Sequence, residues 1–129
     1  MRSSTLRLFS VLTLVILFAQ SSLAQDLKVG QRYEIRTLSG LAIDNLSSLD
    51  QDARLVVNTP SKDAEGQVWT FIDCGNGTGD FCIASPVSNM AIDNGNHYDS
   101  EAPVIQWGTD PSNPNQQWTA KRLANGNYT

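Results

Sequence analysis

The side chains able to do acid–base or metal chemistry are few in this sequence. His97 is the single histidine, so no histidine-pair metal site can form, and it has no recognisable nucleophile partner. Gly75, Gly77 and Gly79 lie in a predicted hairpin turn rather than before a helix, which argues against a phosphate-binding loop. The sequence therefore predicts a chain that is not an enzyme and that uses no cofactor and no metal.

Two carboxylates that could pair in a glycosidase, Asp44 and Asp93, occupy equivalent points of an internal repeat. A shift of 49 residues aligns residues 39–45 with 88–94, and it also aligns the Q-x-W segments 67–69 and 116–118. A glycosidase needs its two carboxyl groups about 5 to 10 Å apart. The two aspartates belong to different repeats, so they are not expected to face each other across one bond as a catalytic pair.

Short apolar segments separated by clusters of Ser, Asn, Asp, Gly and Pro predict about four strands in each repeat. Tyr33 and Ile35 alternate with polar neighbours, as do Phe81 and Ile83, which is typical of half-buried strands. The other strands are predicted at residues 41–43, 55–57, 69–72, 90–92, 104–107 and 118–120. No long stretch of helical periodicity follows residue 24. The pattern predicts an all-β fold with repeats at about 32–73 and 80–122.

The first 24 residues have the layout of a secretory signal peptide. Arg2 and Arg7 precede an apolar stretch of about eleven residues, and small residues lead up to Ala24. A membrane-spanning helix needs roughly twenty apolar residues, so an anchor is not expected. The sequence predicts a chain that is secreted to the extracellular space, or to the periplasm if the source is bacterial, with a single mature domain at residues 25–129.

The charge of the mature chain excludes several classes of partner. Residues 25–129 hold seven basic and thirteen acidic side chains, a net charge of −6. Such a surface repels phosphate backbones and anionic lipids, so neither nucleic acid nor a membrane is an expected partner.

Two cysteines, Cys74 and Cys82, flank a turn-rich loop. An exported chain meets an oxidising compartment, so a disulfide between them is the expected outcome. No C-x-x-C motif is present, and a structural role is therefore favoured over a redox or metal role.

The combination of two Q-x-W signatures with two apolar-Asp motifs resembles a known family. Gln67-Val68-Trp69 and Gln116-Gln117-Trp118 each follow Ile43-Asp44 or Ile92-Asp93 by about two dozen residues. This arrangement resembles the ricin B-chain type of β-trefoil lectin, which also occurs as carbohydrate-binding modules of bacterial glycosidases. The resemblance covers about residues 32–122 and implies a β-trefoil-like fold.

A β-trefoil has three such units, whereas this sequence has two and the start of a third. Residues 125–129 parallel Gly79-Asp80-Phe81, the turn and first strand of the second unit. Two units leave strand edges open. Three explanations stay open. The sequence is a truncated fragment, or self-association or an additional chain completes the trefoil, or the fold is an open two-unit sheet.

The resemblance implies a sugar-binding set in the second repeat. A sugar packs its C–H face on an aromatic ring and its hydroxyls on fixed donors and acceptors, with a carboxylate as the strongest acceptor. Asp93 would accept hydroxyl protons, Trp107 would form the stacking platform, Asn115 would bind a further hydroxyl, and Gln116 would border the pocket. His97 and Tyr98 would line the rim. The alternative is that Asp93 caps a turn and that Trp107 lies in the core, since Ile105 would point to the same side of a regular strand.

The first repeat keeps only part of this set. Asp44 is present with Gln67, but Asn58 replaces the tryptophan and Gly66 replaces the asparagine. We expect a weak or inactive second site there. In the family the Q-x-W tryptophans, here Trp69 and Trp118, are buried packing residues, so structural roles are expected for them.

The functional prediction is a secreted, lectin-like module that binds a glycan or polysaccharide and targets a partner or enzyme to it. One alternative is a structural or protein-interaction trefoil without sugar binding, because one fold hosts unrelated functions. Another is a fragment of a larger glycoside hydrolase. Retention of Asp93, Trp107 and Asn115 in one unit favours the lectin.

Overall fold

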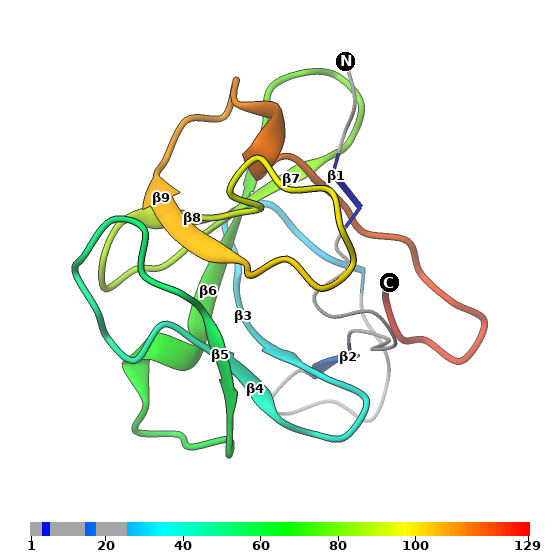
Figure 1. Cartoon of the computed structure of the whole chain (residues 1–129). Coiled ribbons are helices and arrows are strands. Elements are labelled where there is room, and N and C mark those ends of the chain that lie inside the picture. Colours follow the sequence, from blue (N-terminus) through cyan, green and yellow to red (C-terminus); the bar gives the residue numbers. More distant parts are fainter. Residues whose placement is uncertain (1–3, 6–14, 18–25) are drawn as a thin grey trace.

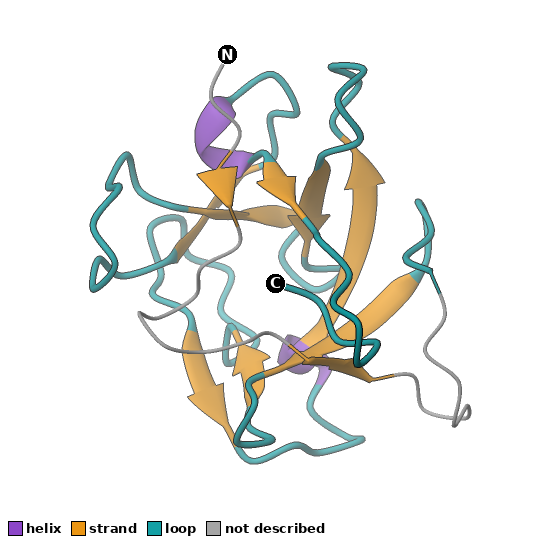
Figure 2. Cartoon of the chain, turned by 90° about the vertical axis from the view of Figure 1, so that its right-hand side faces the viewer, coloured by secondary structure: helices purple, strands orange, loops and turns teal. Residues whose placement is uncertain are grey.

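Strands make up almost all of the regular structure, as the sequence predicted. The computed structural model describes residues 4–5, 15–17 and 26–129, so the predicted signal peptide lies largely outside the described residues. Figure 2 shows the strands together with short 3₁₀ turns. No helix of the described residues is long and apolar enough to cross a membrane. The prediction of an all-β fold is confirmed.

The strands form two equivalent groups joined into one sheet. The bounds are β1 Ser4–Thr5, β2 Val15–Leu17, β3 Arg32–Arg36, β4 Ala42–Asp44, β5 Val56–Asn58, β6 Val68–Asp73, β7 Phe81–Ala84, β8 Met90–Asp93, β9 Ile105–Gly108 and β10 Trp118–Thr119. The 3₁₀ turns are η1 Glu65–Gln67 and η2 Pro114–Gln116. In the first repeat β3 pairs with β4 and β6, and β4 pairs with β5. In the second repeat β7 pairs with β8 and β10, and β8 pairs with β9, so the pattern recurs.

The two repeats are joined by strand pairing as well as by the covalent chain. Strands β6 and β7 form an antiparallel pair from Thr70↔Ala84 to Asp73↔Phe81. Figure 1 shows the hairpin β8–β9 above the hairpin β4–β5, with the loop after β4 running beside β9. A bridge between Arg54 and Ile105 makes this second junction. Of the described N-terminal strands, β1 pairs with β10 at one end of the strand order, and β2 pairs with β3 within it.

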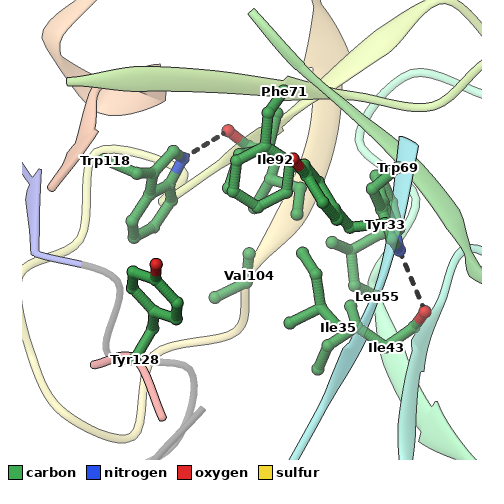
Figure 3. Packing of buried hydrophobic residues seen from close by; sticks show 11 residues of the cluster. Tyr33, Ile35, Ile43, Leu55, Trp69, Phe71, Ile92, Val104, Trp118 and Tyr128 are labelled. Atoms are coloured by element: carbon green, nitrogen blue, oxygen red, sulfur yellow. Dashed lines mark hydrogen bonds between the residues drawn. The ribbon is translucent and has the colours of Figure 1, made fainter. Parts of the chain in front are cut away.

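The core is built by equivalent side chains from both repeats (Figure 3). Trp69 and Trp118 are 0% and 3% exposed, and their indole Nε1 atoms donate to the carbonyl oxygens of Ile43 (3.0 Å) and Ile92 (2.9 Å). The residues of the cluster are Tyr33, Ile35, Ile43, Leu55, Trp69, Phe71, Ile83, Ile92, Val104, Trp118 and Tyr128. A buried tryptophan satisfies its one donor in this way, and the same bond forms twice because the sequence repeats.

The chain ends in the start of a third unit. Arg122 bridges Tyr128, as Asp73 pairs with Phe81 one unit earlier, and Tyr128 is 5% exposed beside Trp118 in the core (Figure 3). The β-trefoil-like fold with two repeats and the beginning of a third is therefore confirmed. Completion of the third unit by self-association or by an additional chain stays a prediction.

Candidate functional site

A pocket of about 400 Å³ lies at the junction of the two repeats. The predicted residues Asp93, Trp107 and Asn115 line it together, although they come from β8, β9 and the turn η2. The other lining residues are Asp52, Arg54, Gly95, His97, Pro103, Ile105 and Asn113. The sequence placed the three predicted residues on one repeat, and the fold brings them to one concave surface.

Asp93 lies at the floor of the pocket with its carboxylate fixed on both oxygens. Oδ1 accepts from the backbone N–H of Gly95 over 2.7 Å, and Oδ2 accepts from Nε2 of Gln116 over 2.9 Å. The residue is only 3% exposed. A carboxylate has about four lone-pair sites, so two remain for hydroxyl donors from the pocket. Asp93 does accept a turn N–H, as the alternative interpretation held, but it also lines the pocket.

Trp107 forms a wall of the pocket rather than part of the core. Its side chain is 40% exposed, whereas Ile105, two residues earlier on β9, is 8% exposed. Both residues line the pocket, so they do point to the same side of the strand. Ile105 is covered because it pairs with Asp93 on one side and bridges Arg54 on the other. The exposed indole offers a flat apolar surface beside a carboxylate.

Asn115 lies in the turn η2, where hydrogen bonds to neighbouring residues hold its backbone. Its backbone N–H donates to Oδ1 of Asn113 over 3.0 Å, and its carbonyl accepts from the N–H of Asn94 over 3.1 Å. The hydroxyl of Tyr98 contacts its Oδ1 at 3.4 Å. The backbone of Asn115 is thereby fixed while its amide faces the pocket with donors and an acceptor. His97 also lines the pocket.

Gln116 lies behind the pocket and is fully buried. Nε2 donates to Asp93 and to the carbonyl oxygen of Gly108 (2.9 Å), and Oε1 accepts from the N–H of Asp110 (2.8 Å). Both N–H groups and the oxygen of the side-chain amide therefore have hydrogen-bond partners within the protein. Gln116 can act on a ligand only through Asp93, and it is not among the lining residues.

The first repeat reproduces this scaffold but has no room for a side chain at the position that corresponds to Asn115. Gln67 donates to Oδ2 of Asp44 over 3.0 Å and to the carbonyl oxygen of Thr59, as Gln116 does one repeat later. Asn58 reaches the same Oδ2 at 3.5 Å. Gly66 is buried, and a Cβ at this position would lie 2.6 Å from Oδ1 of Asp44. No side chain equivalent to Asn115 fits there.

Sequence reasoning missed Asp52 and Arg54, which the first repeat contributes to the pocket of the second. It also missed Gln106, which is fully buried between the repeats. Oε1 of Gln106 accepts from Nδ2 of Asn45 (3.0 Å), and its Nε2 donates to the carbonyl oxygen of Asp50 (2.7 Å). The positions of these residues depend on how the two repeats pack against each other. An alignment of one repeat with the other contains no information about that packing.

The two cysteines and Asp80 lie outside the pocket and contact other protein groups. Sγ of Cys74 and Sγ of Cys82 face each other at 2.9 Å as buried thiols, and burial raises the pKa of both. Burial also acts to raise the pKa of Asp80, but hydrogen bonds from Thr78, Thr119 and Asn76 outweigh it and lower the pKa. Among the described residues no group of three or more His, Cys, Asp or Glu side chains could hold a metal ion.

Comparisons with solved structures give the same fold. A designed threefold-symmetric protein, ThreeFoil, is 28% identical with a TM-score of 0.60, and the match covers 71% of this chain and 64% of that one. An exo-β-1,3-galactanase from Clostridium thermocellum is 27% identical with a TM-score of 0.59, over 71% of this chain and 20% of that one. This chain thus spans less than two thirds of either protein.

A third structure shows the fold alone. The cytolethal distending toxin of Haemophilus ducreyi is 15% identical with a TM-score of 0.51, over 70% of this chain and 55% of that one. No curated protein matches the sequence. The family model described as ricin-type β-trefoil lectin domain-like matches residues 65–129, half of the chain, including the whole second repeat from β7 to β10. The chain is a member of the ricin-type β-trefoil lectin domain-like family.

Proposed function

We propose that this chain is a secreted carbohydrate-binding module whose working site is the pocket of the second repeat. The observation that carries the proposal is the meeting of Asp93, Trp107 and Asn115 on one concave surface. An aromatic face, a carboxylate and an amide are the three kinds of group that a sugar ring needs. The proposed ligand is a glycan or polysaccharide.

The chemistry of the pocket is that of binding. Trp107 packs against the C–H face of a sugar. The fixed Asp93 carboxylate accepts charge-assisted hydrogen bonds from two sugar hydroxyl groups. Asn115 serves a further hydroxyl as donor or acceptor. Because hydrogen bonds already hold Asp93 and the backbone of Asn115, a ligand meets a site that loses little conformational freedom on binding.

The comparisons support a sugar ligand. The family is lectin-like, and one similar structure is an exo-β-1,3-galactanase, of which this chain covers 20%. A small share of an enzyme that acts on a galactan is consistent with a module that brings a catalytic partner to polysaccharide. We therefore propose a targeting role, with no catalysis by this chain itself.

The first repeat contributes little to binding in this account. Asn58 offers no aromatic platform. A side chain at Gly66, where Asn115 stands in the second repeat, would collide with Oδ1 of Asp44 and Oδ1 of Asn45. One working site per chain makes a weak binder, whose useful avidity comes from multivalency.

Export and oxidation complete the proposal. Residues 1–24 serve as the signal peptide, and the exported chain joins Cys74 to Cys82 in a disulfide. The two sulfur atoms already face each other across the ends of β6 and β7, next to the pair Asp73↔Phe81. The bond would pin this hairpin, which links the two repeats.

A glycan array tests the proposal. The mature chain is compared with Trp107→Ala and with Leu49→Ala, a matched loss of an exposed apolar side chain outside the pocket. We expect the wild type and Leu49→Ala to bind the same glycans, and we expect Trp107→Ala to lose them by at least about tenfold. Circular dichroism confirms that each variant is folded. A folded wild type that binds no glycan would favour a structural or protein-interaction role.

A further inference from the structure

We propose that the pocket binds at least two sugar units in line, with Asp52 and Arg54 of the first repeat forming the second subsite. The inference rests on the proposed function and extends it from the kind of ligand to its length. Asp93, Trp107 and Asn115 form the first subsite. The second subsite lies on the opposite flank of β9, where the first repeat packs against the second.

The segment 52–55 runs along β9 as an additional strand-like neighbour. The N–H of Leu55 donates to the carbonyl of Val104, and the N–H of Gln106 donates to the carbonyl of Ala53, both over 2.9 Å. The N–H of Asp52 donates back to Gln106 over the same distance. The pocket is therefore floored by three adjacent backbone segments, which are β8, β9 and this segment.

Ile105 sets the distance between the two subsites. It pairs with Asp93 of β8 on one side and bridges Arg54 on the other. Neighbouring strands lie about 4.8 Å apart, so the backbones of Asp93 and Arg54 are about 10 Å apart. This span exceeds a single pyranose ring. A sugar seated on Asp93 and Trp107 thus leaves the far end of the pocket open for the next unit of an oligosaccharide.

Asp52 and Arg54 are equipped to bind that unit. Arg54 forms the bridge to β9, Asp52 lies in the turn just before it, and both side chains line the pocket. Within residues 26–129 neither the Asp52 carboxylate nor the Arg54 guanidinium makes a side-chain hydrogen bond or an ion pair. Together they offer acceptors and five N–H donors to neighbouring hydroxyls.

The subsite is held by a buried polar cluster rather than by a free loop. Nε2 of Gln106 donates to the carbonyl oxygens of Ser48 (3.0 Å) and Asp50 (2.7 Å), directly before Asp52. Oε1 of Gln106 accepts from Oγ of Ser88 over 3.0 Å. Satisfied buried networks of this kind are rigid. A shift of 49 residues places Glu101 and Pro103 at the equivalent positions, so the Asp52 and Arg54 pair belongs to this junction alone.

The test compares matched monosaccharides and disaccharides on the folded mature chain. The probes are galactose, glucose and xylose with β-1,3-galactobiose, cellobiose and xylobiose, and affinities are measured by NMR titration. The variants are Arg54→Ala and Asp52→Asn, because Asp52 has a φ of +68° that asparagine tolerates. Lys62→Ala removes an exposed cation outside the pocket as a control.

We expect at least one disaccharide to bind the wild type about tenfold tighter than its monosaccharide, since hydrogen bonds to charged groups contribute this much. Arg54→Ala should abolish that gain and leave the monosaccharide affinity unchanged, whereas Lys62→Ala should change neither. Equal wild-type affinities for the mono- and disaccharides, or an unchanged gain in Arg54→Ala, would overturn the second subsite alone. A folded wild type that binds none of the probes would overturn the proposed function and the subsite with it.

Discussion

Gln116 donates a hydrogen bond from Nε2 to Oδ2 of Asp93 over 2.9 Å, and so fixes the carboxylate at the floor of the pocket. The equivalent bond from Gln67 to Asp44 measures 3.0 Å in the first repeat. The glutamine of each Q-x-W signature thus supports an aspartate in both repeats. In the second repeat this aspartate lines the pocket, together with Trp107 and Asn115.

Replacing Gln116 should harm both stability and binding. Gln116→Ala leaves Asp93, the carbonyl of Gly108 and the N–H of Asp110 without their partner, at a cost of roughly 2–4 kcal/mol in the free energy of unfolding. Urea denaturation measures the loss. Sugar binding should weaken at least tenfold, since Asp93 is no longer held.

Gln67→Ala is the matched control, because it breaks the equivalent bonds in the first repeat. It should destabilise the fold by a similar amount while binding by the second repeat persists. Equal losses of binding in both variants would show that Gln116 acts through stability alone.

Space explains why the first repeat should resist conversion into a second site. Gly66→Asn places a Cβ 2.6 Å from Oδ1 of Asp44 and 2.7 Å from the backbone N of Ser47, closer than atoms tolerate. We expect a destabilisation of about 1–3 kcal/mol in chemical denaturation, and no gain of binding even when Asn58→Trp is added. The reverse change, Asn115→Gly, should leave the fold intact and weaken binding. A stable double variant with a second binding event in calorimetry would contradict this account.

The two thiols should make stability depend on pH only in the reduced protein. Burial holds the pKa of Cys74 and Cys82 above the ordinary value, so the native state keeps protons that the unfolded state releases. Their contribution to the free energy of unfolding is complete below the pKa of a cysteine in the unfolded chain, about 8.5. It falls as pH rises above that value, by up to about 1.4 kcal/mol per pH unit for each thiol.

Urea denaturation at pH 7.5 and pH 10, with and without reductant, measures this difference. Lysines and tyrosines titrate in both forms, so the contrast between the two forms isolates the cysteines. The oxidised protein should also lose two hydrogens by mass spectrometry. Identical pH dependence with and without reductant would show that the thiols are not coupled to folding.

The sequence predicted the parts of the fold that each repeat contains within itself. A shift of 49 residues brought together Trp69 with Trp118 and Asp44 with Asp93, and these pairs have the same hydrogen bonds in the structure. Alternation correctly predicted β3, where Tyr33 and Ile35 are buried between more exposed neighbours. For β7 the strand was predicted but its half-burial is wrong, because Cys82, Ile83 and Ala84 are all buried. Such features follow from local pattern, and repetition doubles the signal.

Contacts between the repeats could not be predicted in this way. Arg54 reaches the pocket of the second repeat because segment 52–55 bonds to β9, and Gln106 is buried because the loop after β4 covers it. Neither contact recurs at a fixed shift. The position of Trp107 depends on them too, since the first repeat covers Ile105 and leaves the next residue on the same side exposed.

The three tryptophans allow the most direct test of sugar binding by the second repeat. The indole N–H groups of Trp69 and Trp118 are bonded to backbone carbonyls in the core, whereas Trp107 is exposed in the pocket. In a two-dimensional NMR spectrum of the ¹⁵N-labelled mature chain, titration with the mono- and disaccharide probes should shift the Trp107 indole signal in a saturable way and leave the other two unchanged. A Trp107 signal that stays unmoved at high concentrations of every probe, in a folded protein, would contradict the account.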